Sequence, residues 1–118
     1  MPTEVSMLDH VNFTVKDLDA SFEFYHKVFG FEPMERDDSN SPRWGIMKSN
    51  DAIICMTERP NCEFIDRHEA VKRGLQYMAH VGMRIHDRES WEATIIDQDI
   101  KVNYGGEIKM PHGSSWYI

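Results

Sequence analysis

The chain has 118 residues, of which 41% are hydrophobic and 28% charged, and its formal net charge is −7. This length suits one domain with an ordinary core, and the composition is that of a globular protein. Because no basic stripe interrupts the acidic balance, neither nucleic acid nor an anionic membrane is an expected partner. Two cysteines, Cys55 and Cys62, are too few for a disulfide framework, and they indicate reduced thiols in a cytoplasmic protein. The N-terminus lacks the basic and apolar regions of a signal peptide.

The first half of the chain predicts one strand, one helix and three further strands. Polar and apolar residues alternate from Leu8 to Lys16, which is typical of a strand with one face on a core. Asp17 then offers an N-cap, and Gly30 a C-terminal stop, for a helix between them. The apolar stripe of that helix consists of Leu18, Phe22, Tyr25 and Phe29. Strands are then predicted over 31–36, 43–48 and 51–58, with a polar loop at 37–42 between the first two.

The second half predicts a connector and a shorter version of the same pattern. Apolar residues recur at helical spacing within 59–75, so part of the connector is predicted to be helical. Met78–Ile85 alternates as the first strand does, and a short helix is predicted over 89–97. Short strands are predicted over 101–104, 107–110 and 114–118. A fourth strand of this half would begin beyond Ile118, either in a longer chain or in another molecule.

The two halves repeat each other in sequence. LDHVNFTVKDLDAS at 8–21 matches MAHVGMRIHDRES at 78–90, and a shift of 70 residues carries His10 onto His80. Such a repeat usually means two copies of one supersecondary unit. Each copy then holds a histidine at the same place in its first strand, and two imidazoles brought together in this way are half of a metal site.

The residues that carry this repeat also resemble a known family. The segment LDHVNFTVKDLDASFEFYHKVFGF at 8–31 is similar to the opening of the vicinal oxygen chelate superfamily. The similar elements are the His-Val pair, the Asp-Leu before the helix, the FY within it and the V-F-G-F at its exit. MAHVGMRI resembles the start of the second module. This superfamily includes glyoxalase I, extradiol dioxygenases, methylmalonyl-CoA epimerase, and the fosfomycin and bleomycin resistance proteins.

The resemblance implies an α+β fold of two βαβββ modules, whose mixed sheets form a cup around a divalent metal ion. The 118 residues would form a single domain, with a first module at 1–60, a connector at 61–76 and an incomplete second module at 77–118. It also implies a homodimer, because modules in this superfamily are commonly paired between chains. An exposed edge of the last strand would itself favour such pairing.

By the same resemblance, His10 and His80 match the first-strand metal ligands of the two modules. Cys55 falls at or next to the last-strand ligand of the first module, and the final carboxylate ligand would lie beyond Ile118. A cysteine where glyoxalase I often has glutamate favours the dioxygenase branch, which uses two histidines and one carboxylate. Fe(II) or Mn(II) is then the favoured ion, with Zn(II) or Ni(II) as alternatives. Cys55 is also open to a simpler interpretation, as a small core residue of an apolar strand.

The remaining candidates each have a structural alternative. His112 and Tyr117 are candidate catalytic residues, although His112 is also typical of an exposed loop. Asn12, Arg84 and Trp116 are candidate substrate-binding residues, although Arg84 could pair with an acidic side chain and Trp116 could pack in the core.

The sequence therefore favours a divalent-metal-dependent enzyme that acts on a small substrate chelating the metal through vicinal oxygens. A dioxygenase-like reaction is preferred to a glyoxalase I-like lyase. The alternative from another class is a metal-free protein that sequesters an antibiotic or another small ligand, as bleomycin resistance proteins do.

Overall fold

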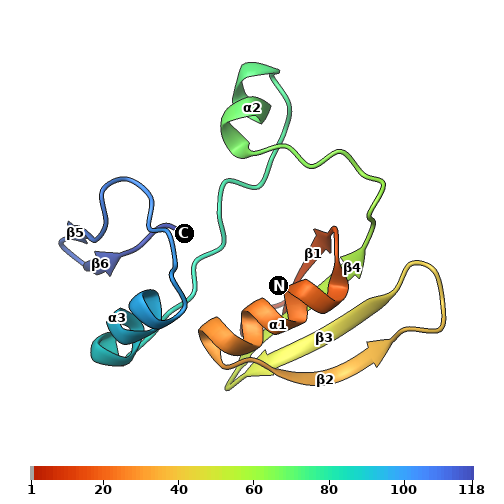
Figure 1. The fold of residues 1–118 in the computed structure, drawn as a ribbon, viewed down its shortest axis with the longest axis horizontal. Coiled ribbons are helices and arrows are strands. Elements are labelled where there is room, and N and C mark those ends of the chain that lie inside the picture. The colour runs from red at the N-terminus through yellow and green to blue at the C-terminus, as the bar shows by residue number, and fades with distance from the viewer. Residues whose placement is uncertain (1) are drawn as a thin grey trace. The chain divides into compact units, whose positions relative to one another are not determined.

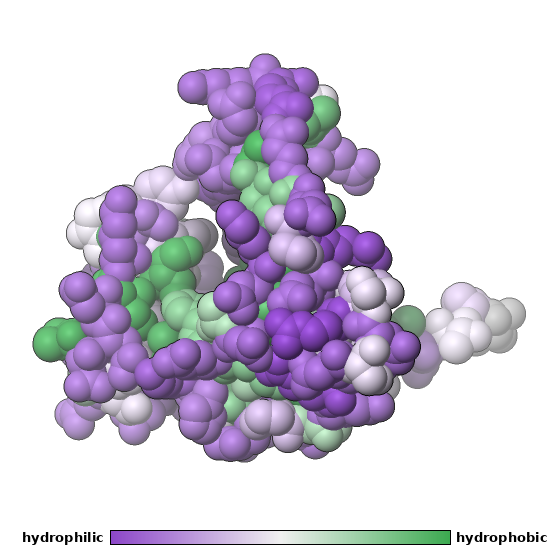
Figure 2. Space-filling model, turned by 45° about the vertical axis from the view of Figure 1, so that its right-hand side comes forward, coloured by the Kyte–Doolittle hydropathy of each residue, from purple (hydrophilic) through white to green (hydrophobic). Residues whose placement is uncertain are grey.

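The computed structural model describes residues 2–118, and the chain divides after Ala79 into two compact units. None of the helices in these residues is long and apolar enough to cross a membrane. On the face drawn in Figure 2, hydrophilic side chains predominate and apolar ones gather in smaller groups between them.

The first unit is a βαβββ module. Its elements are β1 (Val11–Val15), α1 (Leu18–Phe29), β2 (Glu32–Asp37), β3 (Trp44–Ser49) and β4 (Ala52–Glu58). The strands lie in the order β1-β4-β3-β2, with β1 parallel to β4 and the other pairs antiparallel (Figure 1). This mixed sheet confirms the predicted fold class. Helix α2 (Arg67–Lys72) follows in the connector and is much shorter than the connector itself.

Helix α1 begins and ends where its sequence predicts. The Asp17 carboxylate accepts a hydrogen bond from the Ala20 N–H at 3.1 Å, and Gly30 adopts the left-handed conformation at φ 71°. Leu18 and Phe22 are buried as expected, but the next buried position is Val28. The predicted stripe residues Tyr25 and Phe29 are only partly buried. Their rings instead belong to an aromatic cluster in which Tyr25 contacts Phe29.

The core of the first unit lies between α1 and one face of the sheet. Met47 of β3 and Ile54 and Met56 of β4 are buried there. The Phe22 ring of α1 lies directly over Gly45, where an added Cβ would come within 2.3 Å of the ring. A glycine at this position therefore permits the close approach of helix and sheet.

Alternate residues of the same strands form the opposite face, which we call the far face. In its central row Asn12 of β1 pairs in register with Cys55 of β4, and Cys55 pairs with Ile46 of β3. The Thr57 hydroxyl donates a hydrogen bond to the Asn12 carboxamide oxygen at 3.3 Å, which places both on this face. Because strand residues alternate between faces, the polar residues of β1 lie here while its valines lie toward α1.

The second unit contains α3 (Arg88–Asp97) and a hairpin of β5 (Ile108–Met110) and β6 (Gly113–Ser115). Asp87 caps α3 by accepting a hydrogen bond from the Ser90 N–H at 3.0 Å, as Asp17 caps α1. The sequence repeat therefore extends to the cap. Trp91 of α3 is buried, and its ring contacts Trp116 edge-to-face at 6.5 Å between centroids.

Two predicted strands of the second half are absent from the described residues. Met78–Ile85 belongs to no sheet, and all of its residues except Met83 are exposed. In the first unit the equivalent strand β1 is held by β4, and residues 80–118 contain no counterpart of β4. A strand without a hydrogen-bonded neighbour has nothing to stabilise its ladder.

The region predicted as a strand at 101–104 is irregular backbone that leads into a turn. Tyr104 has a positive φ of 58°, and Gly105 follows at φ 80°. Left-handed residues in succession turn the chain and cannot continue a strand. The strand predicted over 114–118 is likewise restricted to Gly113–Ser115.

Candidate functional site

His10 lies immediately before β1, and its side chain is about half exposed (48%). Its Nδ1 is 2.7 Å from an Asp9 carboxylate oxygen, so in the tautomer that carries this proton the ring donates to Asp9. Nε2 is then the lone-pair nitrogen. A histidine oriented by a carboxylate through one nitrogen is the arrangement commonly found in metal ligands, because it fixes the tautomer and raises the basicity of the other nitrogen.

Cys55 lies in the middle of β4, on the far face. Burial, and to a lesser degree the negative charge of Asp9, raise the pKa of its thiol. A raised pKa keeps the group as a neutral thiol at neutral pH, whereas metal binding requires the thiolate. This environment supports the interpretation of Cys55 as a small neutral side chain of the sheet.

Asn12 is a polar residue of β1, two positions after His10. Because its carboxamide oxygen accepts the Thr57 hydroxyl, the orientation of the amide is set, and its Nδ2 remains as a pair of donors. Such an amide can donate hydrogen bonds to an oxygen of a bound molecule. Asn12 and Cys55 are the two predicted site residues that the first unit brings together in register.

His80 begins the second unit and is exposed. Its ring contacts Tyr117 edge-to-face, with 5.7 Å between centroids and 85° between the planes. Tyr117 in turn contacts Tyr104 in the same manner at 5.5 Å. Thus the second unit brings together two predicted site residues, His80 and Tyr117, of which one is a candidate ligand and the other a candidate catalytic group.

The other predicted site residues of the second unit differ in their local environments. His112 is exposed in the turn between β5 and β6. Arg84 is exposed within the segment that forms no strand. Trp116 is half-buried by Trp91, and the Arg88 guanidinium lies 5.3 Å from the centroid of its indole ring. Its ring therefore has packing partners within its own unit.

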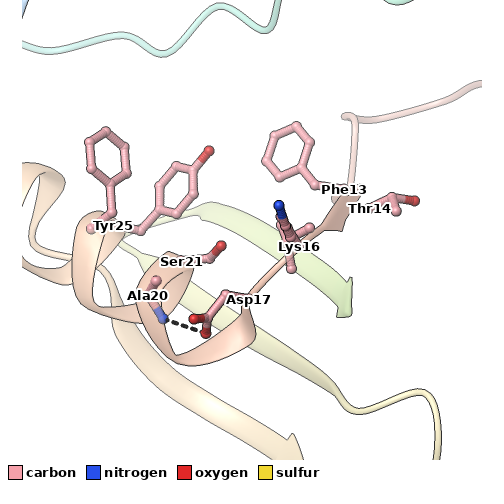
Figure 3. A pocket seen from close by; sticks show the side chains of 9 residues that line it. Phe13, Thr14, Lys16, Asp17, Ala20, Ser21 and Tyr25 are labelled. Carbon is pink, nitrogen blue, oxygen red and sulfur yellow. Dashed lines mark hydrogen bonds between the residues drawn. The ribbon is translucent and has the colours of Figure 1, made fainter. Parts of the chain in front are cut away.

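A shallow groove of about 510 Å³ runs along β1 and the first half of α1. Figure 3 shows Phe13 and Tyr25 pointing to the same side of this groove, with Lys16 between the strand and the helix. Phe13 and Tyr25 have nearly parallel rings, 6.2 Å apart. The sequence did not predict this groove, because Tyr25 was assigned to the apolar stripe that faces the core. The adjacent aromatic residues Phe24 and Tyr25 could have indicated this groove. Two consecutive residues of a helix point in different directions, so both cannot lie in one buried stripe.

Arginines and carboxylates form a network of ion pairs at the end of the sheet near the start of α1. The sequence did not predict this network. Arg43 binds Glu58 through two nitrogens at 3.0 and 2.7 Å, and Glu58 accepts the Leu18 N–H at 2.8 Å. Arg36 binds Asp19 and Asp38. The hydrogen bonds from Arg43, then that from Leu18, lower the pKa of Glu58 from 4.5 to about 2. Glu58 therefore joins β4 both to Arg43, the residue before β3, and to the N-terminus of α1.

We expect Glu58→Gln to flatten the acid dependence of stability. A carboxyl whose pKa is lowered in the folded state contributes stability that is complete above its ordinary pKa. That stability is lost as the pH falls from 4.5 toward about 2. Glutamine cannot ionise, so this contribution disappears from the variant. Urea denaturation at several pH values measures the slope, with Glu35→Gln as a control for the loss of an exposed carboxylate from β2. Equal slopes for wild type and Glu58→Gln would contradict the assignment.

The chain offers imidazole donors for a metal ion but not a complete ligand set. Among residues 2–118, no three histidine, cysteine, aspartate or glutamate side chains gather closely enough to hold one. His10 fits a metal ligand by chemistry and by its Asp9 partner. The chemistry of the residues present therefore fits a divalent ion only in part, through imidazole nitrogens such as that of His10.

Comparison with known proteins shows the family of this chain. The sequence model of the Glyoxalase/Bleomycin resistance protein/Dioxygenase superfamily matches residues 7–105. The chain belongs to this superfamily. The match covers both histidine segments and confirms the resemblance identified from the sequence. No curated protein was found that matches the chain.

Several solved structures share the fold of this chain at low sequence identity. A FosX fosfomycin resistance protein mutant from Listeria monocytogenes, complexed with Mn(II) and 1S,2S-dihydroxypropylphosphonic acid, has a TM-score of 0.68 and 15% identity. That likeness covers 97% of this chain and 85% of the Listeria protein. A domain of the superfamily from Frankia sp. EAN1pec has a TM-score of 0.72 and 15% identity, over 92% of this chain and 78% of the other. UcmS2 has a TM-score of 0.65 and 18% identity, over 96% and 89%.

Proposed function

We propose that this superfamily member is a divalent-metal-dependent enzyme whose small substrate presents two vicinal oxygens to the metal. The observation that supports the proposal is the contact between the Nδ1 of His10 and the Asp9 carboxylate. This contact leaves the lone pair of Nε2 available to a metal ion. Metal-ligating histidines commonly have a carboxylate that sets the tautomer in this way. His80, its counterpart in the sequence repeat, is proposed as the second ligand.

Mn(II) or Fe(II) is the proposed ion, with Zn(II) and Ni(II) as the alternatives. Two imidazoles and one carboxylate leave coordination positions open for a substrate. Such an ion, when bound, supplies Lewis-acid stabilisation of the negative charge that develops on chelated oxygens. The Listeria protein supports this proposal, because the molecule bound with its Mn(II) is by name a vicinal diol.

The remaining predicted site residues of both units have proposed roles in binding or converting the substrate. Asn12 would donate its Nδ2 hydrogens to a substrate oxygen, with Thr57 holding the amide in the required orientation. Arg84 would bind an anionic group of the substrate, and Trp116 would border it. His112 and Tyr117 are the proposed candidates for proton transfer. Of the possible reactions, we prefer cleavage of the substrate's ring by dioxygen to a lyase reaction.

Loss of metal binding in histidine variants tests this proposal. We expect His10→Ala and His80→Ala each to lower the affinity for Mn(II) by at least about tenfold, since even the loss of a partner outside the coordination sphere commonly costs that much. Calorimetric titration of the metal-free protein with Mn(II) measures the affinity. His86→Ala is the matched control, because His86 is an exposed histidine near His80 in sequence.

The same preparations separate the possible reactions. The metal-loaded protein is incubated with catechol and dioxygen, with the hemithioacetal of methylglyoxal and glutathione, and with fosfomycin. Ring cleavage would support the dioxygenase-like reaction. Isomerisation of the hemithioacetal would replace it with the glyoxalase I-like lyase. Equal Mn(II) affinity in wild type and both histidine variants would reject the metal site and leave the metal-free binding protein as the function.

A homodimer is part of the proposal. Among residues 2–118 the outer edge of β1 and the segment Met78–Ile85 have no strand neighbour, and exposed edges of this kind are usually covered. A symmetric second copy would cover them in both chains. Light scattering at micromolar concentration measures the oligomeric state, and a monomer would reject this part of the proposal.

A further inference from the structure

We propose that Tyr117 holds the His80 imidazole in one orientation and is therefore a positioning residue for this ligand. The inference rests on the proposed function of His80, but the contact itself is a property of the metal-free chain. The two rings meet at 85° with 5.7 Å between centroids, which is the favourable edge-to-face geometry of aromatic pairs.

His80 needs such a partner because its backbone supplies little restraint. It lies in Met78–Ile85, which has no strand partner among residues 2–118, and its side chain is exposed. An exposed side chain on unpaired backbone samples several rotamers freely. His10, by contrast, has the Asp9 carboxylate to orient its ring. Within residues 80–118, the edge-to-face contact with Tyr117 restrains the ring of the second histidine.

Tyr117 is itself restrained by a backbone hydrogen bond and by a ring contact, so it can orient the ring of a neighbour. Its carbonyl oxygen accepts the Asn103 N–H at 2.6 Å, which fixes its backbone. The Tyr104 ring packs edge-to-face against its ring at 5.5 Å and 79°. Tyr104 adopts a left-handed backbone at φ 58°, a costly conformation for a tyrosine that brings its ring back toward Tyr117.

This role differs from that of an acid or base, because it requires the ring of Tyr117 and not its hydroxyl. Phenylalanine retains the ring and should therefore support His80 fully. Leucine keeps much of the volume but lacks an aromatic face. The pair Tyr117→Phe and Tyr117→Leu consequently separates positioning through the ring from proton transfer through the oxygen.

NMR spectroscopy of the metal-free protein tests the contact directly. We expect cross-relaxation between the ring protons of His80 and Tyr117, and three-bond couplings that indicate one χ1 rotamer for His80. Both should persist in Tyr117→Phe, whereas the couplings should average in Tyr117→Leu. Averaged couplings in wild type, or equally rigid couplings in Tyr117→Leu, would overturn the inference.

Titration with Mn(II) then tests the consequence. Tyr117→Leu should weaken binding roughly threefold to tenfold, the range that one edge-to-face ring pair supplies, and Tyr117→Phe should bind as wild type does. Unchanged affinity in Tyr117→Leu, together with a loss in His80→Ala, would overturn the positioning role alone. Unchanged affinity in His80→Ala would reject the proposed function, and the NMR couplings would still decide whether Tyr117 orients His80.

A second variant guards against unfolding by Tyr117→Leu. Tyr104→Leu leaves Tyr117 in place but removes the ring that packs against it. We expect the His80 couplings in this variant to lie between those of wild type and full averaging. Amide resonances of α3 show whether the second unit is folded. Full rigidity of His80 in a folded Tyr104→Leu protein would count against the proposed support of Tyr117.

Discussion

Met56→Ala is expected to destabilise the first unit by about 2–5 kcal/mol, the usual cost of removing a large buried side chain from a core. Met56 is fully buried (0% exposed) on the helix side of β4, the strand between β1 and β3. Its removal would leave a cavity under α1 that neighbouring strands cannot easily fill. Amide hydrogen exchange of β3 and β4 measures the free energy of unfolding of this unit separately from the second.

The adjacent residue provides a matched control. Cys55 precedes Met56 in β4 and lies on the far face, where it is only partly buried. Cys55→Ala should therefore cost about 1 kcal/mol or less. A large loss of stability in Cys55→Ala would show that the far face is part of the core. A small loss would leave a folded variant in which the contribution of the thiol to Mn(II) binding can be measured.

Gly45→Ala is expected to destabilise the same unit by about 1–3 kcal/mol, the range for overpacking a core. An added Cβ would come within 2.3 Å of the Phe22 Cζ atom and 2.6 Å of its Cε1 atom. The ring cannot move away easily, because it is buried under α1 and the Arg36 guanidinium lies 4.8 Å from its centroid. Urea denaturation followed by exchange of the β3 amides measures the effect.

A double-mutant cycle identifies the ring as the cause. Phe22→Ala alone should cost about 3–5 kcal/mol, but it also removes the atoms that the new methyl group would meet. Gly45→Ala should then cost close to nothing in the Phe22→Ala background. The coupling between the two positions should thus be about 1–3 kcal/mol, within the range known for residues in contact. Equal costs of Gly45→Ala in both backgrounds would exclude the ring and indicate strain in the β3 backbone.

The two proposed ligands differ in how their orientation is secured. Asp9 is the sequence neighbour of His10, so a carboxylate close to the first imidazole follows from the sequence itself. Tyr117 is far from His80 in sequence, and only the fold of residues 80–118 brings their rings together. The repeat thus predicted a pair of equivalent histidines, whereas the structure gives each of them a different supporting residue.

Local signals in the sequence determined the elements of the first module. Alternation defined β1, and the Asp17 cap and the left-handed Gly30 defined both ends of α1, because these depend on residues a few positions apart. The motif at 8–31 likewise predicted the superfamily by resemblance, and the Asp87 cap shows that the sequence repeat extends into structure. Such features need no knowledge of distant contacts.

Tertiary structure alone decided which residues are buried, which strands form and which side chains meet. Val28 replaced Tyr25 and Phe29 in the core because the position of α1 on the sheet, closely set at Gly45, selects the buried side. Met78–Ile85 has the alternation of β1 but forms no strand, since a strand requires a neighbour and residues 80–118 supply none for it. The Glu58–Arg43 pair and the Tyr117–His80 contact join residues distant in sequence, and such pairs are determined only when the chain has folded.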